Sequence, residues 1–191
     1  MTSAAPTPRI APLDPPYTPE VGAMLERWMP PGNDIEPLRL FRTLAVHHEL
    51  ASRMRPLGAA ILRHGLIDPR ERELMIHRTC ARTGAEYEWG VHALAFGAPL
   101  GLSDAQLAAT VNATHEHPVW SAHDALLIRL ADELHDTCRV SEQLWASLAQ
   151  HYTDAQLLEL LVIAGHYRVI SYVVNAVRIE PEPWAARFPA S

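Results

Sequence analysis

Glu88 and His92 lie four residues apart in the stretch TGAEYEWGVH, whose apolar spacing is helical. When a helix over residues 85–97 is projected at about 100° per residue, Glu88 falls near the middle of one wide arc and His92 falls inside the same arc. The rest of this arc is apolar: Leu94, Tyr87, Val91, Ala95, Ala85, Phe96 and Trp89. Because Glu86, Gly90 and Gly97 occupy the narrow opposite face, we expect them to face solvent, and Glu88 and His92 to face the core.

The preceding helix, predicted over residues 69–83, repeats this arrangement. Glu73 projects from the centre of its apolar arc, which also carries Leu74, Ile76, His77, Cys80, Ala81 and Thr83. The opposite face carries the charged residues Glu71, Arg78 and Arg82. A second carboxylate is therefore expected at a core-facing position.

An ionised carboxylate that is buried without a partner costs several kcal/mol, so these glutamates must be neutralised, paired or directed at a cavity. If Glu73 and Glu88 approach each other, repulsion and desolvation should raise the pKa of one of them, and the pair could hold a proton. His92 could extend a proton relay. We therefore predict Glu73, Glu88 and His92 as catalytic acid/base residues; the alternative is a structural polar contact between helices.

Helix start and stop signals define the surrounding elements. Asp68, Pro69 and Glu71 predict a capping box at a helix start, and Gly84 predicts its end. The hexapeptides LSDAQL and YTDAQL, at residues 102–107 and 152–157, each predict another capping box. Further helices are expected over 20–29, 37–53, 55–64, 121–136, 141–150 and 154–177. Since no segment alternates with a period of two, the fold class is predicted to be all-α.

Length and proline content suggest the domain organisation. With 191 residues the chain is long enough for one buried domain, and short for two. We expect a proline-rich N-terminal arm over residues 1–19, a helical domain over 20–182 and a C-terminal tail over 183–191. In an oligomer the arm could wrap a neighbouring subunit.

Composition excludes several kinds of partner. The chain carries 16 basic and 22 acidic residues, a net charge of −6, and no basic cluster, so neither nucleic acid nor an anionic membrane is expected as a partner. With no signal-peptide core and no obvious membrane span, a cytoplasmic location is expected. Cys80 and Cys138 form no C-x-x-C motif, so we expect two small core residues rather than a disulfide or a zinc site.

The segment RELMIHRTCARTGAEYEWGVH resembles the core motif of the carboxymuconolactone decarboxylase and AhpD-like superfamily. Redox members carry Glu, then eleven residues, Cys, two residues, Cys, three residues and His; here these positions hold Glu73, Ala85, Glu88 and His92. The stretch DAQLLELLVIAGHYRVISYVVNAVRIEPE resembles the family's C-terminal helix. The likeness covers most of residues 36–182 and implies an AhpD-like helical domain that forms a homo-oligomer.

The departure from the redox motif also matters. Ala85 and Glu88 cannot supply the attacking and resolving thiols, so disulfide-based peroxidase activity is not expected. In lacking the cysteine pair, the chain is similar to the decarboxylase branch. That resemblance implies a cofactor-free lyase or isomerase for a small carboxylated or lactone-type substrate. In that reaction, the resemblance implies that Glu88 is the base or acid, that His92 polarises the substrate or relays the proton, and that Glu73 adjusts the proton affinity of the site or shuttles the proton.

Three alternatives remain open at this point. Glu73, His77, Glu88 and His92 could together hold a divalent metal ion, although no metal or other cofactor is our prediction. Cys80 could act as the single cysteine of a peroxidase. The chain could also be a non-catalytic helical assembly protein.

Overall fold

The structure of the protein, a computed structural model, describes residues 7–29 and 36–190. All regular structure in these residues is helical, so the all-α prediction is confirmed. In chain order the elements are α1 (Pro19–Trp28), α2 (Arg39–Leu44), the 3₁₀ turn η1 (Ala45–His47), α3 (His48–Arg63), α4 (Pro69–Arg82), α5 (Glu86–His92), the π-helical turn η2 (Ala93–Gly97), α6 (Asp104–Asn112), α7 (Ala122–Thr137), α8 (Glu142–Leu148) and α9 (Asp154–Val177).

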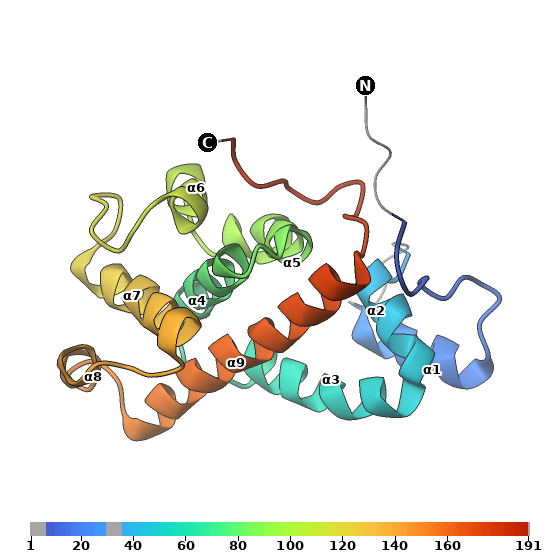
Figure 1. Ribbon diagram of the computed structural model, residues 1–191. Helices are drawn as coiled ribbons and strands as arrows, with labels where there is room; N and C mark the ends of the chain where they lie inside the picture. Colours follow the sequence, from blue (N-terminus) through green and yellow to red (C-terminus); the bar gives the residue numbers. More distant parts are fainter. Residues whose placement is uncertain (1–6, 30–35, 191) are drawn as a thin grey trace.

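Helix α4 lies at the centre of the domain and packs against α5, α6, α7 and α9. The long helix α9 crosses the molecule, with α4 and α5 on one side and α3 on the other, while α7 and α8 lie at one end and α1 and α2 at the opposite end (Figure 1). The core between these helices is apolar and fully buried, and includes Leu74, Ile76, Leu127, Leu160 and Ile163.

Helices α4 and α7 are joined by a row of ion pairs. Arg70 pairs with Asp124 at 2.8 Å, and Arg78 pairs with Asp132 at 2.7 Å. Both pairs join residues 54 positions apart in sequence. A constant offset along the row requires two helices that run parallel with the same rise. Arg78 was expected to face away from the core, but it is 4% exposed because Asp132 and two carbonyl groups accept its hydrogen bonds.

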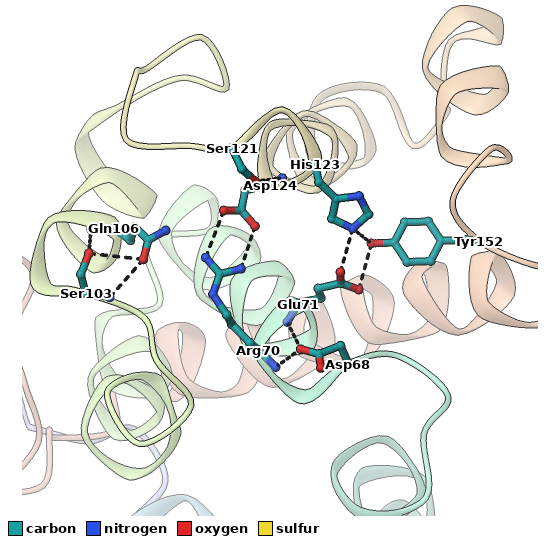
Figure 2. Close-up of polar contacts among 9 residues, drawn as sticks. All are labelled: Asp68, Arg70, Glu71, Ser103, Gln106, Ser121, His123, Asp124 and Tyr152. Atoms are coloured by element: carbon teal, nitrogen blue, oxygen red, sulfur yellow. Dashed lines mark hydrogen bonds and ion pairs between the residues drawn. The ribbon is translucent and has the colours of Figure 1, made fainter.

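The start of α4 is fixed by polar contacts that also reach α7 and the loop before α9 (Figure 2). Asp68 caps the helix as predicted, since its carboxylate accepts from the backbone N–H of Arg70 at 2.9 Å. The prediction that Glu71 completes a capping box is wrong. Its carboxylate accepts instead from the Tyr152 hydroxyl at 3.0 Å and lies 2.7 Å from Nε2 of His123.

Two capping boxes and one glycine stop signal are confirmed. Ser103 and Thr153 each cap a helix, α6 and α9, and each receives the reciprocal contact from a glutamine three residues later. Gly84 follows α4 with φ of +66°, a left-handed conformation that glycine adopts without steric cost.

The helix boundary expected near residue 54 is wrong. The helical segment breaks at η1, where His47 leaves the helical conformation and its ring Nδ1 accepts from the backbone N–H of Leu50 at 3.3 Å. Helix α3 then continues through Pro56. A histidine cap is outside the usual set of capping residues, so the capping signals do not reveal that a helix starts after His47.

The π-helical turn η2 follows His92 and changes which side chains face the core. Leu94 was expected on the buried arc but is 53% exposed, whereas Gly97 was expected on the open face and is buried. The hydrogen bond from Ala98 N to Ala93 O spans five residues. Because a π turn advances by less than 100° per residue, the α-helical projection misplaces the residues within it.

The C-terminal tail covers the face of α5 on which Gly90 was expected to meet solvent. Ala186 N donates to Gly90 O at 3.3 Å, and the Glu86 carboxylate accepts from Phe188 N and pairs with Arg187. At the other end of the chain, the described part of the arm lies against its own domain, where Arg9 N donates to Val177 O. The proposed wrapping of a neighbour by the arm is untested.

We expect Gly90→Ala to displace the tail. A Cβ atom at this position would lie 2.0 Å from the carbonyl oxygen of Ala186, which no real contact allows. The loss should be about 1–3 kcal/mol of unfolding free energy, with faster tryptic cleavage after Arg187. Gly22→Ala in α1 is the control, because its Cβ would meet only an ordinary contact at 3.9 Å. Unchanged stability and cleavage in Gly90→Ala would contradict this account.

Helix α9 alone among the described helices is long and apolar enough to cross a membrane, with a mean hydropathy of 1.5 over its most apolar window. We expected no such span from the sequence. Leu157, Leu160, Ile163 and Tyr167 are buried on one side of α9, which packs against α4, α5 and α3. These contacts make α9 one of the core helices of the domain, with 44% of its most apolar window buried.

Candidate active site

The three predicted site residues meet at one imidazole. Glu73 projects from α4, and Glu88 and His92 project from successive turns of α5. Nδ1 of His92 lies 2.8 Å from Oε2 of Glu73, and Nε2 of the same ring lies 3.5 Å from Oε1 of Glu88. The exposed fractions of Glu73, Glu88 and His92 are 0%, 7% and 4%. The structure therefore brings the predicted residues together, with His92 between the two carboxylates.

Arg72 completes the group and was not predicted as part of it. Its Nε and Nη2 atoms donate to Oε1 of Glu73 at 3.2 and 3.1 Å, and its Nη1 donates to the carbonyl of Leu62. Both oxygens of Glu73 are thus occupied, one by a guanidinium and the other by an imidazole. A buried carboxylate with two charged donors is held in one orientation.

The protonation of the group differs from our prediction. Burial alone would raise the pKa of Glu73, but the charge and hydrogen bond of His92, together with His77 and Arg72, lower it below 4.5. Burial alone would lower the pKa of His92, but Glu73 and then Glu88 raise it to about 9. The prediction that repulsion between the carboxylates raises a glutamate pKa does not hold for Glu73, whose pKa is lowered. The imidazole separates them and takes the proton, so the group contains an imidazolium at neutral pH.

A cavity of about 430 Å³ adjoins one side of this group. Glu88 and His92 line it, whereas Glu73 does not, so the Glu73 carboxylate supports His92 from behind. The walls are mainly apolar and come mostly from α1, α2, α3, α5, η2 and α9. The rings of Phe96 and Tyr167 each lie 5.0 Å from the His92 ring and fix its plane. The volume is typical of sites for small organic molecules.

Other aromatic residues divide between the cavity and the core. His166 lines the cavity. Trp89 does not line the cavity, and its indole N–H points toward α6 and donates to Thr110 at 2.9 Å. The Tyr87 hydroxyl donates to Glu182 at 2.6 Å and accepts from Leu40 N, which ties the end of the domain to the start of α2.

His77 does not join the group as a metal ligand. Its Nδ1–H is assigned as the donor to the backbone carbonyl of Glu73, at 2.7 Å. Burial, and then the charge of His92, lower the pKa of His77 to about 4, so the ring is neutral. In the described part of the chain, no three His, Cys, Asp or Glu side chains are arranged to hold a metal ion. The geometry therefore does not support the metal alternative.

Neither cysteine lies on the cavity. Cys80 is fully buried, and burial raises the pKa of its thiol well above the usual value, with Glu88 and Glu73 adding to the rise. Cys138 was expected in the core but is exposed, and it ends α7 in a left-handed conformation with φ of 57°. A buried thiol with a raised pKa is a poor nucleophile, so Cys80 lacks the properties of a peroxidatic cysteine.

Comparisons with known proteins agree with the fold. No protein-family model and no curated protein matches the sequence. Among solved structures, an uncharacterised peroxidase-related protein from Silicibacter sp. TM1040 is 13% identical, with a TM-score of 0.80, and the match covers 99% of this chain and all of that one. A protein of unknown function from Agrobacterium tumefaciens, a candidate antioxidant defence protein AhpD, is 18% identical, with a TM-score of 0.64 over 73% of this chain and 95% of that one.

A third structure is a cysteine-to-alanine variant of the debrominase Bmp8 in complex with 2,3,4-tribromopyrrole. It is 13% identical, has a TM-score of 0.77 and covers 95% of both chains. At these identities the likeness concerns the fold. The resemblance predicted from the sequence is confirmed at that level, and the chain has the AhpD-like helical fold.

Proposed function

We propose that the protein is a cofactor-free acid/base enzyme, a lyase or isomerase, that moves a proton on a small carboxylated or lactone-type substrate in the cavity. One observation carries the proposal. Glu73 holds one nitrogen of His92, so that the other nitrogen lies beside Glu88 at the wall of an apolar cavity. This places a carboxylate base and an imidazolium acid next to each other, out of bulk water.

In the proposed isomerisation, Glu88 takes a proton from a substrate carbon next to a carbonyl group. The electron pair of the broken C–H bond forms a carbon–carbon double bond, and the carbonyl becomes an enolate oxygen. The Nε2–H of His92 donates a hydrogen bond to that oxygen. Glu88 then returns the proton to another carbon of the same π system, and the enzyme regains its starting state. In a decarboxylation, His92 would supply the proton that replaces the lost CO₂.

Peroxidase activity is the second candidate, because two of the structural neighbours are peroxidase-related and AhpD-type proteins. In this chain it would have to use Cys80, which is buried away from the cavity. The debrominase neighbour was solved with a small ring compound, which supports a small-molecule ligand for this fold. We therefore favour proton transfer over thiol chemistry.

The proposal is tested by proton exchange at carbon. The protein is incubated in D₂O with α-angelica lactone and with 6-oxoheptanoate, whose ketone lies at the end opposite its carboxylate, and deuterium uptake and double-bond shift are followed by NMR. We expect acceleration over buffer for at least one compound, and the same acceleration with Cys80→Ala. Reduction of tert-butyl hydroperoxide by dithiothreitol that depends on Cys80, with no proton exchange, would instead establish the peroxidase.

A cytoplasmic location is proposed on the state of the cysteines. Cys80 and Cys138 are both free thiols, and Cys138 is exposed. Unpaired exposed thiols persist in reducing compartments.

We also propose that the protein self-associates through the outer face of α9. Four large apolar side chains on this face are 37–64% exposed: Leu158, Val162, Val169 and Tyr172. With Gly165 between them they follow alternating steps of four and three residues, the spacing of a coiled-coil seam. A Cβ at Gly165 would meet nothing within 4 Å, so the single chain gives no steric reason for this glycine. A second α9 crossing at Gly165 in the antiparallel direction would explain both features.

Val169→Lys is expected to convert such a dimer into a monomer, because it places a charge in the middle of the apolar stripe. Sedimentation velocity of the purified proteins measures this directly. Gln143→Lys, on an exposed turn of α8, adds the same charge elsewhere and should leave the dimer intact. A wild-type protein that sediments as a monomer at micromolar concentration would refute the proposed interface.

A further inference from the structure

Helix α3 forms one wall of the cavity from Met54 to Arg63, so the contacts of its residues identify the two ends of this wall. Near one end, the carbonyl of Leu62 accepts from Arg72, the residue that clamps Glu73. In the middle, Gly58 lies against the ring of His166. Near the other end, Arg55 donates to the backbone carbonyl of Arg27. Since Leu62 and Arg55 are seven residues apart, the two ends are separated by roughly 10 Å along the helix.

The side chain of Arg55 is held in place but is not charge-neutralised. Its Nε and Nη2 atoms both donate to the Arg27 carbonyl, at 3.2 and 2.8 Å, which leaves Nη1 available. Both Arg55 and Arg27 line the cavity. The ion pairs found in residues 7–29 and 36–190 involve neither of them. A third arginine, Arg63, lies next to Leu62 at the other end of this wall, and the one acidic side chain among the described residues on the cavity is Glu88. Arg55 differs from Arg63 in that its contact with Arg27 brings two arginines together at one place.

We propose that Arg55, assisted by Arg27, binds the carboxylate of the substrate at the end of the cavity remote from Glu88 and His92. The substrate is then an elongated acid whose apolar body spans the cavity. This inference rests on the proposed function for the identity of the reacting end. Beyond that function, the inference specifies which end of the substrate carries the charge and how far the charge lies from the reacting carbon.

Charge and wall chemistry both favour this orientation. A carboxylate placed beside Glu88 would compete with it for the single imidazolium of His92, whereas the guanidinium groups of Arg55 and Arg27 can bind a carboxylate through strong charge-assisted hydrogen bonds. The wall between the two ends is apolar, formed by residues such as Leu40, Phe41, Leu44, Val91, Phe96 and Ile170. Such a wall gains free energy by covering a hydrocarbon chain or ring, and loses it by covering a second charge.

The test measures binding rather than turnover. Trp28 and Trp184 line the cavity, so intrinsic fluorescence can report its occupation. The probes are 4-phenylbutyrate and its neutral amide, 4-phenylbutyramide, titrated at pH 7. We expect the wild type to bind the acid at least tenfold more tightly than the amide. Arg55→Gln should remove this preference by weakening the acid only.

Matched variants separate charge recognition from folding. Arg53→Gln removes an exposed arginine of the same helix, paired with Glu49 on the surface, and should keep the preference. Arg55→Lys keeps the charge but loses the planar donor geometry, and should retain part of the preference. If Arg55→Gln melts below the titration temperature, Arg55→Lys and Arg27→Gln decide the question instead.

Equal affinity of the wild type for acid and amide, or an unchanged preference in a folded Arg55→Gln protein, would overturn the inference. Failure of the proposed function looks different. Since Glu88 is remote from the carboxylate site, Glu88→Gln should bind 4-phenylbutyrate as the wild type does. A protein that prefers the acid but catalyses no proton exchange would confirm carboxylate binding at Arg55 and contradict the proposed enzymatic function.

Discussion

Glu73→Gln is expected to cost the folded protein about 3–5 kcal/mol at pH 7, the usual effect of removing one partner from a buried ion pair. Glu73 is fully buried, and its two oxygens accept from Arg72 and His92. An amide cannot accept from both charged groups, and its NH₂ would face one of them. The variant therefore leaves buried positive charge without compensation. This is the largest stability effect that we expect from a single isosteric change in the chain.

The loss should depend on pH in a defined direction. The pKa of His92 is raised from 6.5 to about 9 in the folded protein, so the stabilisation from its charged form is complete below about pH 6.5 and disappears as the pH rises through 9. The pKa of Glu73 is lowered from 4.5, so its contribution is present above that value and disappears as the pH falls below it. The difference between wild type and variant should be largest between about pH 5 and 6.5.

Urea denaturation of both proteins from pH 4 to 10 measures this difference, and NMR of the imidazole protons follows His92 directly. In Glu73→Gln the pKa of His92 should fall, because burial then acts without its main opposing charge. Glu71→Gln is the control, an identical change on the same helix at a residue that bonds to His123 and Tyr152 instead. A pH-independent loss equal in both variants would show that the Glu73 pair contributes nothing specific.

Helical projection placed Glu73, Glu88 and His92 on buried faces correctly, because burial of these residues depends on periodicity within two adjacent helices. Glu73, Glu88 and His92 lie on the buried faces of α4 and α5, and the turn at Gly84 brings those faces together. The projection could not show that His92 stands between the carboxylates, because that depends on the distance and rotation between the helices. For the same reason the projection led us to expect a proton on a glutamate pair, whereas the structure favours the proton on His92.

The missed features all depend on contacts distant in sequence or on irregular backbone. Gly90 was assigned to solvent because no local signal shows that the C-terminal tail crosses it. Arg78 was assigned to the surface because its partner, Asp132, is 54 residues away. Leu94 and Gly97 were exchanged because a π turn has no distinctive sequence pattern. The role of Arg55 could not be predicted from the sequence either, since only the packing of α3 against α1 places this residue on the cavity.

The second large effect is expected on activity. Glu88→Gln should lower both kcat and kcat/KM for proton exchange by about 10²–10⁴-fold, because an amide cannot take a proton from carbon and general base catalysis is worth about that much. Stability should change by less than in Glu73→Gln, because the Glu88 carboxylate is 3.5 Å from the imidazole, while His92 keeps its 2.8 Å contact with Glu73.

Separate measurement of rate and stability distinguishes catalysis from structure at this position. The exchange assay and urea denaturation are performed on Glu88→Gln and on the Glu71→Gln control, which should keep full activity. A Glu88→Gln protein that keeps its activity but loses several kcal/mol would assign Glu88 to a structural pair between turns of α5. An inactive protein of nearly wild-type stability would assign it to the chemistry, since no other effect of so conservative a change removes turnover without weakening the fold.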